Sequence, residues 1–220
     1  MHHPVCLLLM LRAPVPGRVK TRLAAAVGEE RAAALYRAFV EDELAALAGC
    51  GADVVLCLDA DTPEEIEAVR HWLGRERPLI PQARGGLGQR MAEALRWAYG
   101  KGYAAAAVLG SDLPGLDAAT ARQLAQACGE REAVIGPAPD GGYWALGFRA
   151  DCLREEVFTD MPWSTPELYA LTMKRLEGLD IAVLPQVRDV DTLEDLRALA
   201  SEGDAGATRR TLEQLAEMDD

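Results

Sequence analysis

The stretch AAAAVLGSDLPGLDAATARQLAQAC, residues 104–128, holds a complete strand, loop and helix. Residues 104–109 form an uninterrupted run of small and apolar side chains, which is typical of a strand buried on both faces of a sheet. The loop Gly-Ser-Asp-Leu-Pro-Gly follows, and residues 117–128 have the pattern of a helix. This strand–loop–helix order is the repeating unit of a parallel α/β sheet, and it places Asp112 at the carboxyl end of the strand, where such folds bind ligands.

The same alternation extends along the chain on both sides of this unit. We expect further strands at residues 5–11, 54–58, 79–80, 133–136, 143–148 and 181–184, and helices at residues 29–48, 62–73, 86–99, 165–176 and 192–200. Short strands that alternate with helices predict a three-layer αβα fold with a mostly parallel, mixed central sheet. Residues 1–200 are therefore expected to form a single domain, and the polar residues 201–220 a loosely attached helical extension.

The composition is that of a globular protein. The chain has 220 residues, of which 50% are hydrophobic and 26% are charged, and this length suffices for a well-packed core. A net charge of −12 argues against a general nucleic-acid-binding protein. No apolar run approaches the about 20 residues of a membrane helix, so we expect no membrane span. The 5 scattered cysteines without a CxxC pair indicate reduced thiols and a cytoplasmic protein.

A positive region follows the first expected strand. Residues 1–28 contain no Asp or Glu, whereas the segment RAPVPGRVKTR, residues 12–22, is rich in cations. Arginine and lysine can neutralise and orient phosphate oxygens, and glycine lets a ligand approach the backbone closely. The GxxxxGK[ST] spacing of a Walker loop is absent. The alternative is a solvated basic turn. The candidate phosphate-binding residues are Arg12, Gly17, Arg18, Lys20, Thr21 and Arg22.

Acidic residues follow two of the strands. Asp112 lies where an unpaired carboxylate is costly, and a divalent cation that bridges diphosphate oxygens would compensate its charge. Mg²⁺ and Mn²⁺ are the cations that prefer such oxygen ligands. Ser111, beside it, is a candidate phosphate ligand. Asp189 and Asp191 lie on the same side if the last strand continues, and either could supply a second metal carboxylate. The alternatives are that Asp112 caps the following turn and that Asp191 only helps to start the next helix.

Three further segments complete the candidate site. In GPAPDGGYW, residues 136–144, a tight turn could present Asp140 and an aromatic ring to a ligand, and the alternative is a plain hairpin turn. In a transfer reaction, Asp140 is the candidate catalytic base or acceptor-orienting group. The segment QARGGLGQRM, residues 82–91, enters a helix whose N-terminus can accept a phosphate. In WSTP, residues 163–166, Ser164 or Thr165 is expected to cap a helix. The remaining candidates are Gly88 and Arg90 for phosphate, and Gly141, Gly142, Tyr143 and Trp163 for the walls of the ligand pocket.

The segments APVPGRVKTRL, GLGQRM, LGSDLPGL, GPAPDGGYWALG, WST and DVDT, in this order, resemble a bacterial family of glycosyltransferase-like proteins of unassigned substrate. That family belongs to the nucleotide-diphospho-sugar transferase superfamily, which has the GT-A fold. The resemblance covers roughly residues 5–200. More distantly, the chain resembles the phospholactate guanylyltransferases and the molybdenum-cofactor nucleotidylyltransferases.

The resemblance implies a metal-dependent site at the carboxyl edge of the sheet. By position, the basic loop would hold phosphates, Asp112 would bind the metal, and Asp140, Gly141 and Gly142 would lie on the acceptor or sugar side. The chain departs from the glycosyltransferase pattern in one respect. The usual Asp-x-Asp triplet is replaced by Ser-Asp-Leu after the central strand, and the Asp-x-Asp of this chain is Asp189–Asp191.

These features favour a metal-dependent transferase that takes a nucleotide or nucleotide-sugar donor and a small-molecule acceptor. The leading hypothesis is glycosyl transfer from a nucleotide-diphospho-sugar, in which Asp112 and a divalent metal stabilise the departing nucleoside diphosphate. The first alternative is nucleotidylyl transfer from a nucleoside triphosphate to a phosphorylated small molecule, with release of pyrophosphate. The second is a nucleotide-binding protein without catalysis.

Overall fold

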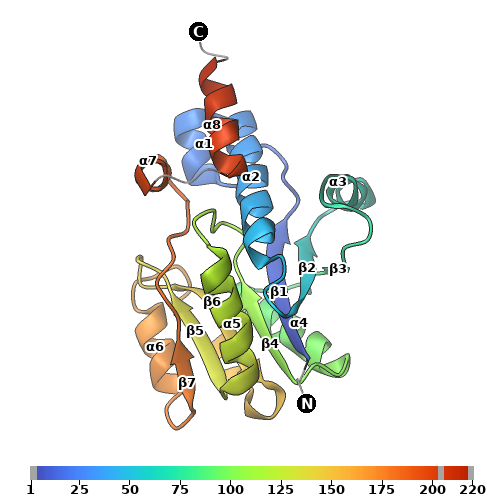
Figure 1. Cartoon of the computed structure of the whole chain (residues 1–220), viewed down its shortest axis with the longest axis vertical. Helices are drawn as coiled ribbons and strands as arrows, with labels where there is room; N and C mark the ends of the chain where they lie inside the picture. The colour runs from blue at the N-terminus through green and yellow to red at the C-terminus, as the bar shows by residue number, and fades with distance from the viewer. Residues whose placement is uncertain (1–3, 203–205, 218–220) are drawn as a thin grey trace.

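The computed structural model in Figure 1 describes residues 4–202 and 206–217. Residues 203–205 and 218–220 of the expected C-terminal extension lie outside the described residues. A central sheet is covered by helices on both faces, which confirms the three-layer α/β fold predicted from the sequence.

The described residues form one sheet of seven strands in the order β3-β2-β1-β4-β6-β5-β7. β6 pairs antiparallel with β4 and β5, and the other neighbouring strands pair in parallel. The sheet is therefore mixed but mostly parallel, as expected. Its strands are β1 (Val5–Arg12), β2 (Asp53–Asp59), β3 (Leu79–Pro81), β4 (Ala105–Leu109), β5 (Ala133–Pro137), β6 (Tyr143–Arg149) and β7 (Ile181–Val183).

The helices match the sequence pattern except at two places. The first is a short helix, α1, within the basic segment. The second is α6, which begins at Leu168 and not at residue 165. A turn comes before it, in which Thr165 Oγ1 donates to the Pro162 carbonyl oxygen. The helices are α1 (Thr21–Val27), α2 (Glu29–Leu47), α3 (Pro63–Leu73), α4 (Leu87–Gly100), α5 (Ala118–Glu130), α6 (Leu168–Arg175), α7 (Leu193–Glu202) and α8 (Ala207–Glu217), with 3-10 turns η1 (Ala150–Cys152) and η2 (Glu155–Phe158).

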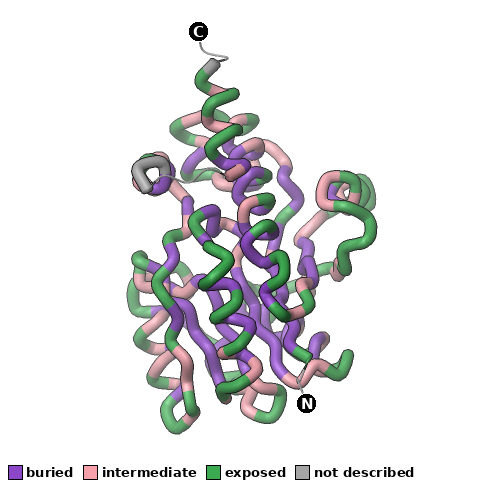
Figure 2. The backbone as a smooth tube through the Cα atoms, viewed as in Figure 1, coloured by how far each residue is buried: buried purple, intermediate pink, exposed green. Residues whose placement is uncertain are grey.

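β1 forms the centre of the core because its side chains alternate between the two faces of the sheet. Leu7, Leu9 and Leu11 pack against α2, α3 and α5 on one face. Cys6 and Leu8 pack against α4, η2 and α6 on the other face. Figure 2 shows the resulting band of buried backbone through the sheet, with exposed residues on the outer sides of the helices.

A third apolar cluster joins the two ends of the chain. Leu23 of α1, Phe39 of α2 and Leu196 of α7 pack around the fully buried Val190, and Leu212 and Leu215 of α8 contact the same cluster. α8 is adjacent to α2, as Figure 1 shows. No helix within residues 4–202 and 206–217 is long and apolar enough to cross a membrane.

Candidate functional site

A cleft of about 540 Å³ lies at the edge of the sheet where β1 and β4 end and β6 begins. Several segments that are distant in the sequence meet there, because the parallel strands deliver their loops to the same edge. The residues predicted from the sequence that line the cleft are Arg12, Arg22, Ser111, Asp112, Asp140, Gly142, Tyr143, Trp163, Asp189 and Asp191.

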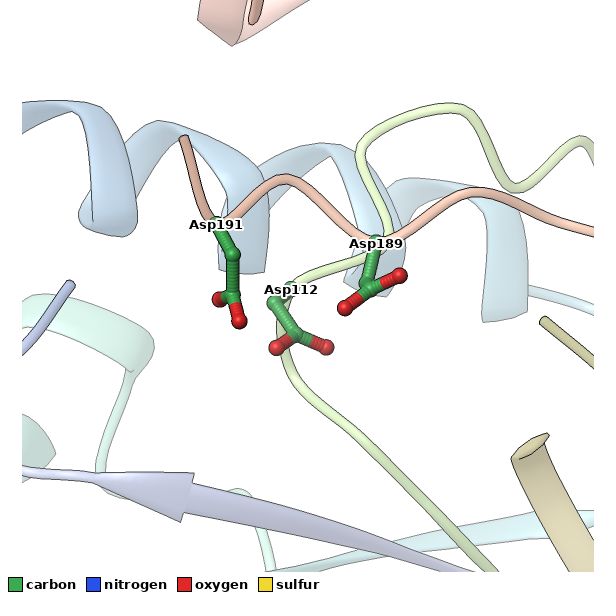
Figure 3. A group of neighbouring side chains, drawn as sticks. All are labelled: Asp112, Asp189 and Asp191. Atoms are coloured by element: carbon green, nitrogen blue, oxygen red, sulfur yellow. The ribbon is translucent and has the colours of Figure 1, made fainter. Parts of the chain in front are cut away.

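Three carboxylates form the acidic centre of the cleft. Oxygen atoms of Asp112, Asp189 and Asp191 lie within 4.8 Å of one another. Figure 3 shows Asp189 and Asp191 on one extended segment, with Asp112 on the loop next to it. We call this set the acidic triad.

The backbone explains why both acids of the last segment face the cleft. β7 ends at Val183, so the strand does not continue to Asp189 and Asp191. The chain is nevertheless held against the β4 loop, where the Val190 N–H donates to the Asp112 carbonyl oxygen at 3.0 Å. Because Val190 is turned into the core, its neighbours Asp189 and Asp191 are directed to the opposite side.

Neither Asp112 nor Asp191 acts as a cap among the described residues. The Asp112 carboxylate accepts its hydrogen bond from Lys20 and none from the described turn that follows it, and other residues cap α5 and α7. Asp117 caps α5 by accepting a hydrogen bond from Thr120 N at 2.6 Å. At α7, Thr192 Oγ1 accepts from Asp195 N at 3.2 Å, while Asp195 Oδ2 accepts from Thr192 N at 2.8 Å. This reciprocal pair is a capping box. The side chains of Asp112 and Asp191 are therefore free to bind other partners.

Lys20 is that partner. Its ammonium Nζ donates to Asp112 Oδ2 at 2.9 Å and to Asp191 Oδ1 at 2.7 Å, and its side chain is only 6% exposed. Burial alone would lower the pKa of Lys20, but the charges of Asp112 and Asp191 outweigh burial and raise it. Lys20 has φ 47°, a left-handed conformation that is unusual for a residue with a side chain. Such strain is found at functional sites, where surrounding contacts maintain it.

Asp189 is surrounded by other carboxylates. Burial, together with the charges of Asp112, Asp140 and Asp191, raises its pKa from 3.8 to about 6. Arg22 adds positive charge, since its Nη1 lies 3.6 Å from Asp191 Oδ2. Three clustered carboxylates with a single buried ammonium provide the hard oxygen ligands that suit Mg²⁺ or Mn²⁺.

Asp140 is held by its own turn at the other end of the cleft. Its Oδ1 accepts a hydrogen bond from Gly142 N at 2.9 Å. Gly141 has φ 88°, and a Cβ there would meet the Pro166 backbone at 2.4 Å, so this turn requires glycine. The close contact fixes the Asp140 turn against the segment that carries Trp163.

The chain matches one family profile and several solved structures. The profile of a family described as "Uncharacterized protein conserved in bacteria" (DUF2064) matches residues 43–165. The chain belongs to the DUF2064 family. A crystal structure from Desulfovibrio desulfuricans G20, provisionally named a nucleotide-diphospho-sugar transferase, has a TM-score of 0.90 and 34% identity over 96% of this chain and 94% of that chain. No protein in the search of curated proteins matches the sequence.

More distant structures share the fold at low identity. A cytidylyltransferase from Leptospira borgpetersenii serovar Hardjo-bovis has a TM-score of 0.59 and 16% identity over 99% of this chain and 96% of that chain. The Mycobacterium tuberculosis H37Rv protein Rv0371c, in complex with manganese, has a TM-score of 0.52 and 18% identity over 90% of this chain and 98% of that chain. Together with the Desulfovibrio protein, they show that this DUF2064 protein has the nucleotide-diphospho-sugar transferase-like fold.

Several predicted phosphate ligands lie outside the cleft in this DUF2064 protein. Arg18 pairs with Asp61 at 2.8 Å and with Glu65 at 2.6 Å. Arg90 pairs with Asp59 at 2.9 Å. A Cβ on Gly88 would lie 2.1 Å from the Phe158 carbonyl oxygen, so this glycine permits α4 to pack against η2. Gly17, Lys20 and Thr21 are likewise not among the residues that line the cleft, and neither is Gly141, which was predicted for the acceptor or sugar side.

Two buried residues beneath the site were not predicted as functional. The Tyr36 hydroxyl accepts a hydrogen bond from Arg12 N at 3.0 Å and lies 2.8 Å from Ser111 Oγ. Its hydrogen is therefore available to orient Ser111. Glu43 of α2 is 0% exposed, and burial and the charge of Asp112 raise its pKa well above the ordinary value. The apolar spacing of α2 identifies Tyr36 only as a core residue. The same spacing places Glu43, three residues after Val40, on the buried face, and this signal could have found it.

Proposed function

We propose that this protein is a metal-dependent transferase that uses a nucleotide donor, and that its reaction is glycosyl transfer from a nucleotide-diphospho-sugar. The observation that carries the proposal is the acidic triad, with the Lys20 ammonium between Asp112 and Asp191. The related Desulfovibrio protein, by its name, supports the nucleotide-diphospho-sugar as the donor class.

The acidic triad is suited to a divalent cation on chemical grounds. Its donors are carboxylate oxygens, which hard cations prefer, and the raised pKa of Asp189 reflects negative charge that a cation would neutralise. Asp112, Asp189 and Asp191 would hold Mg²⁺ or Mn²⁺, which would supply positive charge to stabilise the leaving group.

The chain's own residues supply binding and orientation. Arg12 and Arg22 line the cleft and could bind the diphosphate oxygens. The buried Lys20 ammonium adds positive charge beside Asp112 and Asp191. The Tyr36 hydrogen bond fixes Ser111 as a neutral phosphate ligand. Asp140, from the opposite end of the cleft, orients the acceptor and receives its proton.

Nucleotidylyl transfer is the second candidate. Lys20 and Arg22 both contact Asp191, and two cations beside a metal site also suit a departing pyrophosphate. The two reactions differ in their products. Glycosyl transfer releases a nucleoside diphosphate, whereas nucleotidylyl transfer releases pyrophosphate.

The test measures thermal unfolding with nucleoside triphosphates, diphosphates and nucleotide sugars, each with Mn²⁺, Mg²⁺ or a chelator. A ligand at about 100 times its Kd adds about 2.7 kcal/mol, which shifts the Tm of a chain of this size by about 5–11 °C. We expect a metal-dependent shift with one nucleotide sugar and its diphosphate. A shift with triphosphates alone favours nucleotidylyl transfer.

A matched pair of variants separates the site from general effects of charge. Asp112→Asn should lose the metal-dependent shift, whereas Asp61→Asn, at an exposed acid that pairs with Arg18, should keep it. Release of nucleoside diphosphate or pyrophosphate is then assayed with the stabilising nucleotide. If both variants keep the metal-dependent shift in Tm, the triad is not the metal site. If the nucleotide binds but neither product is released, the protein is a nucleotide-binding protein without catalysis.

A further inference from the structure

The two ends of the cleft differ in charge. The cations among its lining residues, Arg12 and Arg22, come from the end of β1 and from α1. The sheet order places β4 between β1 and β6, so these arginines belong to one end of the cleft and the β6 turn to the other. We call the second end the acceptor half, lined by Asp140, Tyr143, Trp163, Ser164 and Leu168.

Among the described residues that line the acceptor half, none is cationic. The charge there is negative, since Asp140 is part of it and Asp112, Asp189 and Asp191 line the same cleft. A phosphate monoester carries a charge of about −1.5 to −2 at neutral pH. In the acceptor half it would face these acids and the diphosphate of the donor without a cation to pair with.

The walls of the acceptor half are apolar and aromatic. Trp163 and Leu168 belong to it, and Leu87 and Met91 of α4 line the same cleft. α4 approaches Trp163 closely because Gly88 has no side chain, and a Cβ there would lie 2.7 Å from Trp163 Cζ2. Such a surface favours a ligand with an exposed C–H face.

Two polar groups in the acceptor half remain available to a ligand. Ser164 is exposed, has φ 63°, and its hydroxyl has no partner among the described residues, whereas the neighbouring Thr165 hydroxyl is used by the Pro162 carbonyl. Asp140 uses Oδ1 for Gly142 N, and its Oδ2 has no bond to a described residue. A hydroxyl donor and a carboxylate acceptor at one site are complementary to a ligand hydroxyl.

We infer that the acceptor half takes an uncharged, hydroxyl-bearing acceptor with an apolar face and excludes phosphate esters. The inference rests on the proposed glycosyl transfer and names its acceptor class. In that reaction the acceptor hydroxyl oxygen forms the new bond to the donor's sugar carbon, and its proton passes to Asp140. The bond from that carbon to the diphosphate breaks, and its electron pair leaves with the nucleoside diphosphate.

The test uses matched pairs of alcohols and their phosphate esters: glucose and glucose 6-phosphate, glycerol and glycerol 3-phosphate, benzyl alcohol and benzyl phosphate. Their binding is measured by saturation-transfer NMR on the protein with Mg²⁺ and the stabilising nucleoside diphosphate, and again on the protein alone. We expect at least one neutral member to bind about tenfold more tightly than its ester.

Two variants assign the signal to the acceptor half. Ser164→Gly keeps the fold, because glycine adopts φ 63° without strain, and should weaken binding of the neutral compound. Asp140→Asn keeps an oxygen that accepts the hydrogen bond from Gly142 N but removes the negative charge. It should therefore narrow the difference in affinity between an alcohol and its phosphate ester.

The inference is overturned if an ester binds more tightly than its alcohol, or if no neutral compound gives a signal that depends on Ser164. Failure of the proposed function is seen separately, as the absence of any metal-dependent stabilisation by nucleotides. In that case the binding of the alcohols and their esters, measured on the protein alone, still shows whether the acceptor half prefers a neutral or a charged ligand.

Discussion

Asp189 lowers the stability of the metal-free fold at neutral pH while it provides a ligand for a cation. Its carboxylate is crowded by those of Asp112, Asp140 and Asp191, and its pKa of about 6 means that the fold holds a proton there more strongly than the unfolded chain does. Such a group stabilises the fold fully below its ordinary pKa of 3.8, and this contribution is lost as the pH rises through 6. Clustered carboxylates that bind a cation therefore lower the stability of the metal-free protein.

Replacing Asp189 should make the metal-free protein more stable. In chelator at pH 8, Asp189→Asn is expected to raise the free energy of unfolding by about 1 kcal/mol, after allowance for solvent screening. The gain should disappear near pH 4, and stabilisation by Mn²⁺ should be lost. Urea unfolding at both pH values checks this, and a variant that is less stable than wild type at pH 8 would mean that Asp189 has a structural role.

Glu43, which lies in the core, should also make the free energy of unfolding fall as the pH rises. Because burial raises its pKa well above 4.5, the folded protein keeps a proton that the unfolded chain releases. Wild-type stability should therefore fall as the pH rises above 4.5, by up to about 1.4 kcal/mol per pH unit until the raised pKa is reached.

Glu43→Gln removes this titration, so it should gain stability relative to wild type as the pH increases from 5 to 8. Glu41→Gln, on the same helix but exposed, is the matched control and should follow the wild type. Equal pH dependence in wild type and Glu43→Gln would show that Glu43 does not carry the proton.

At the scale of elements, α4 and η2 place Trp163 through a contact that only glycine allows. Gly88→Ala should lower the free energy of unfolding by about 1–3 kcal/mol, because the new methyl group meets the Phe158 carbonyl oxygen and Trp163. Gly86→Ala, two residues earlier with no atom within 4 Å of its Cβ position, should change stability little. Denaturant unfolding compares the two, and similar losses in both would contradict the packing account.

The sequence predicts the sheet and most helices because buried strands and amphipathic helices leave a periodic pattern. It does not predict α1, which has no side-chain cap and buries only Leu23, so neither a cap nor a periodic face marks it. It also misses the turn before α6, since a Thr-Pro pair reads equally well as the start of a helix.

The candidate site was predictable in position but not in pairing. Asp112 follows a buried strand, so its place at the sheet edge is evident from its neighbours. That Lys20 meets Asp112 and Asp191, across 92 and 171 positions of sequence, depends on the fold of the whole chain. The hydroxyl of Tyr36 presents the same difficulty, because core spacing does not reveal what a buried side chain bonds to.

At the scale of the whole molecule, the acidic triad depends on both ends of the chain. Val190 is packed among α1, α2 and α7, and this packing turns Asp189 and Asp191 toward Asp112. α8 contacts the same cluster, and Asp42 of α2 accepts hydrogen bonds from the first residues of that helix. The triad is therefore a product of tertiary packing rather than of one local motif.

The central claim is that the acidic triad binds a divalent cation together with a diphosphate. Its most direct test is Mn²⁺ binding, measured from the EPR signal of free Mn²⁺, with and without nucleoside diphosphate, in wild type, Asp112→Asn and Asp61→Asn. We predict that wild type and Asp61→Asn bind one ion per chain, more tightly with the nucleotide, and that Asp112→Asn does not. Equal Mn²⁺ binding in all three proteins would contradict the account.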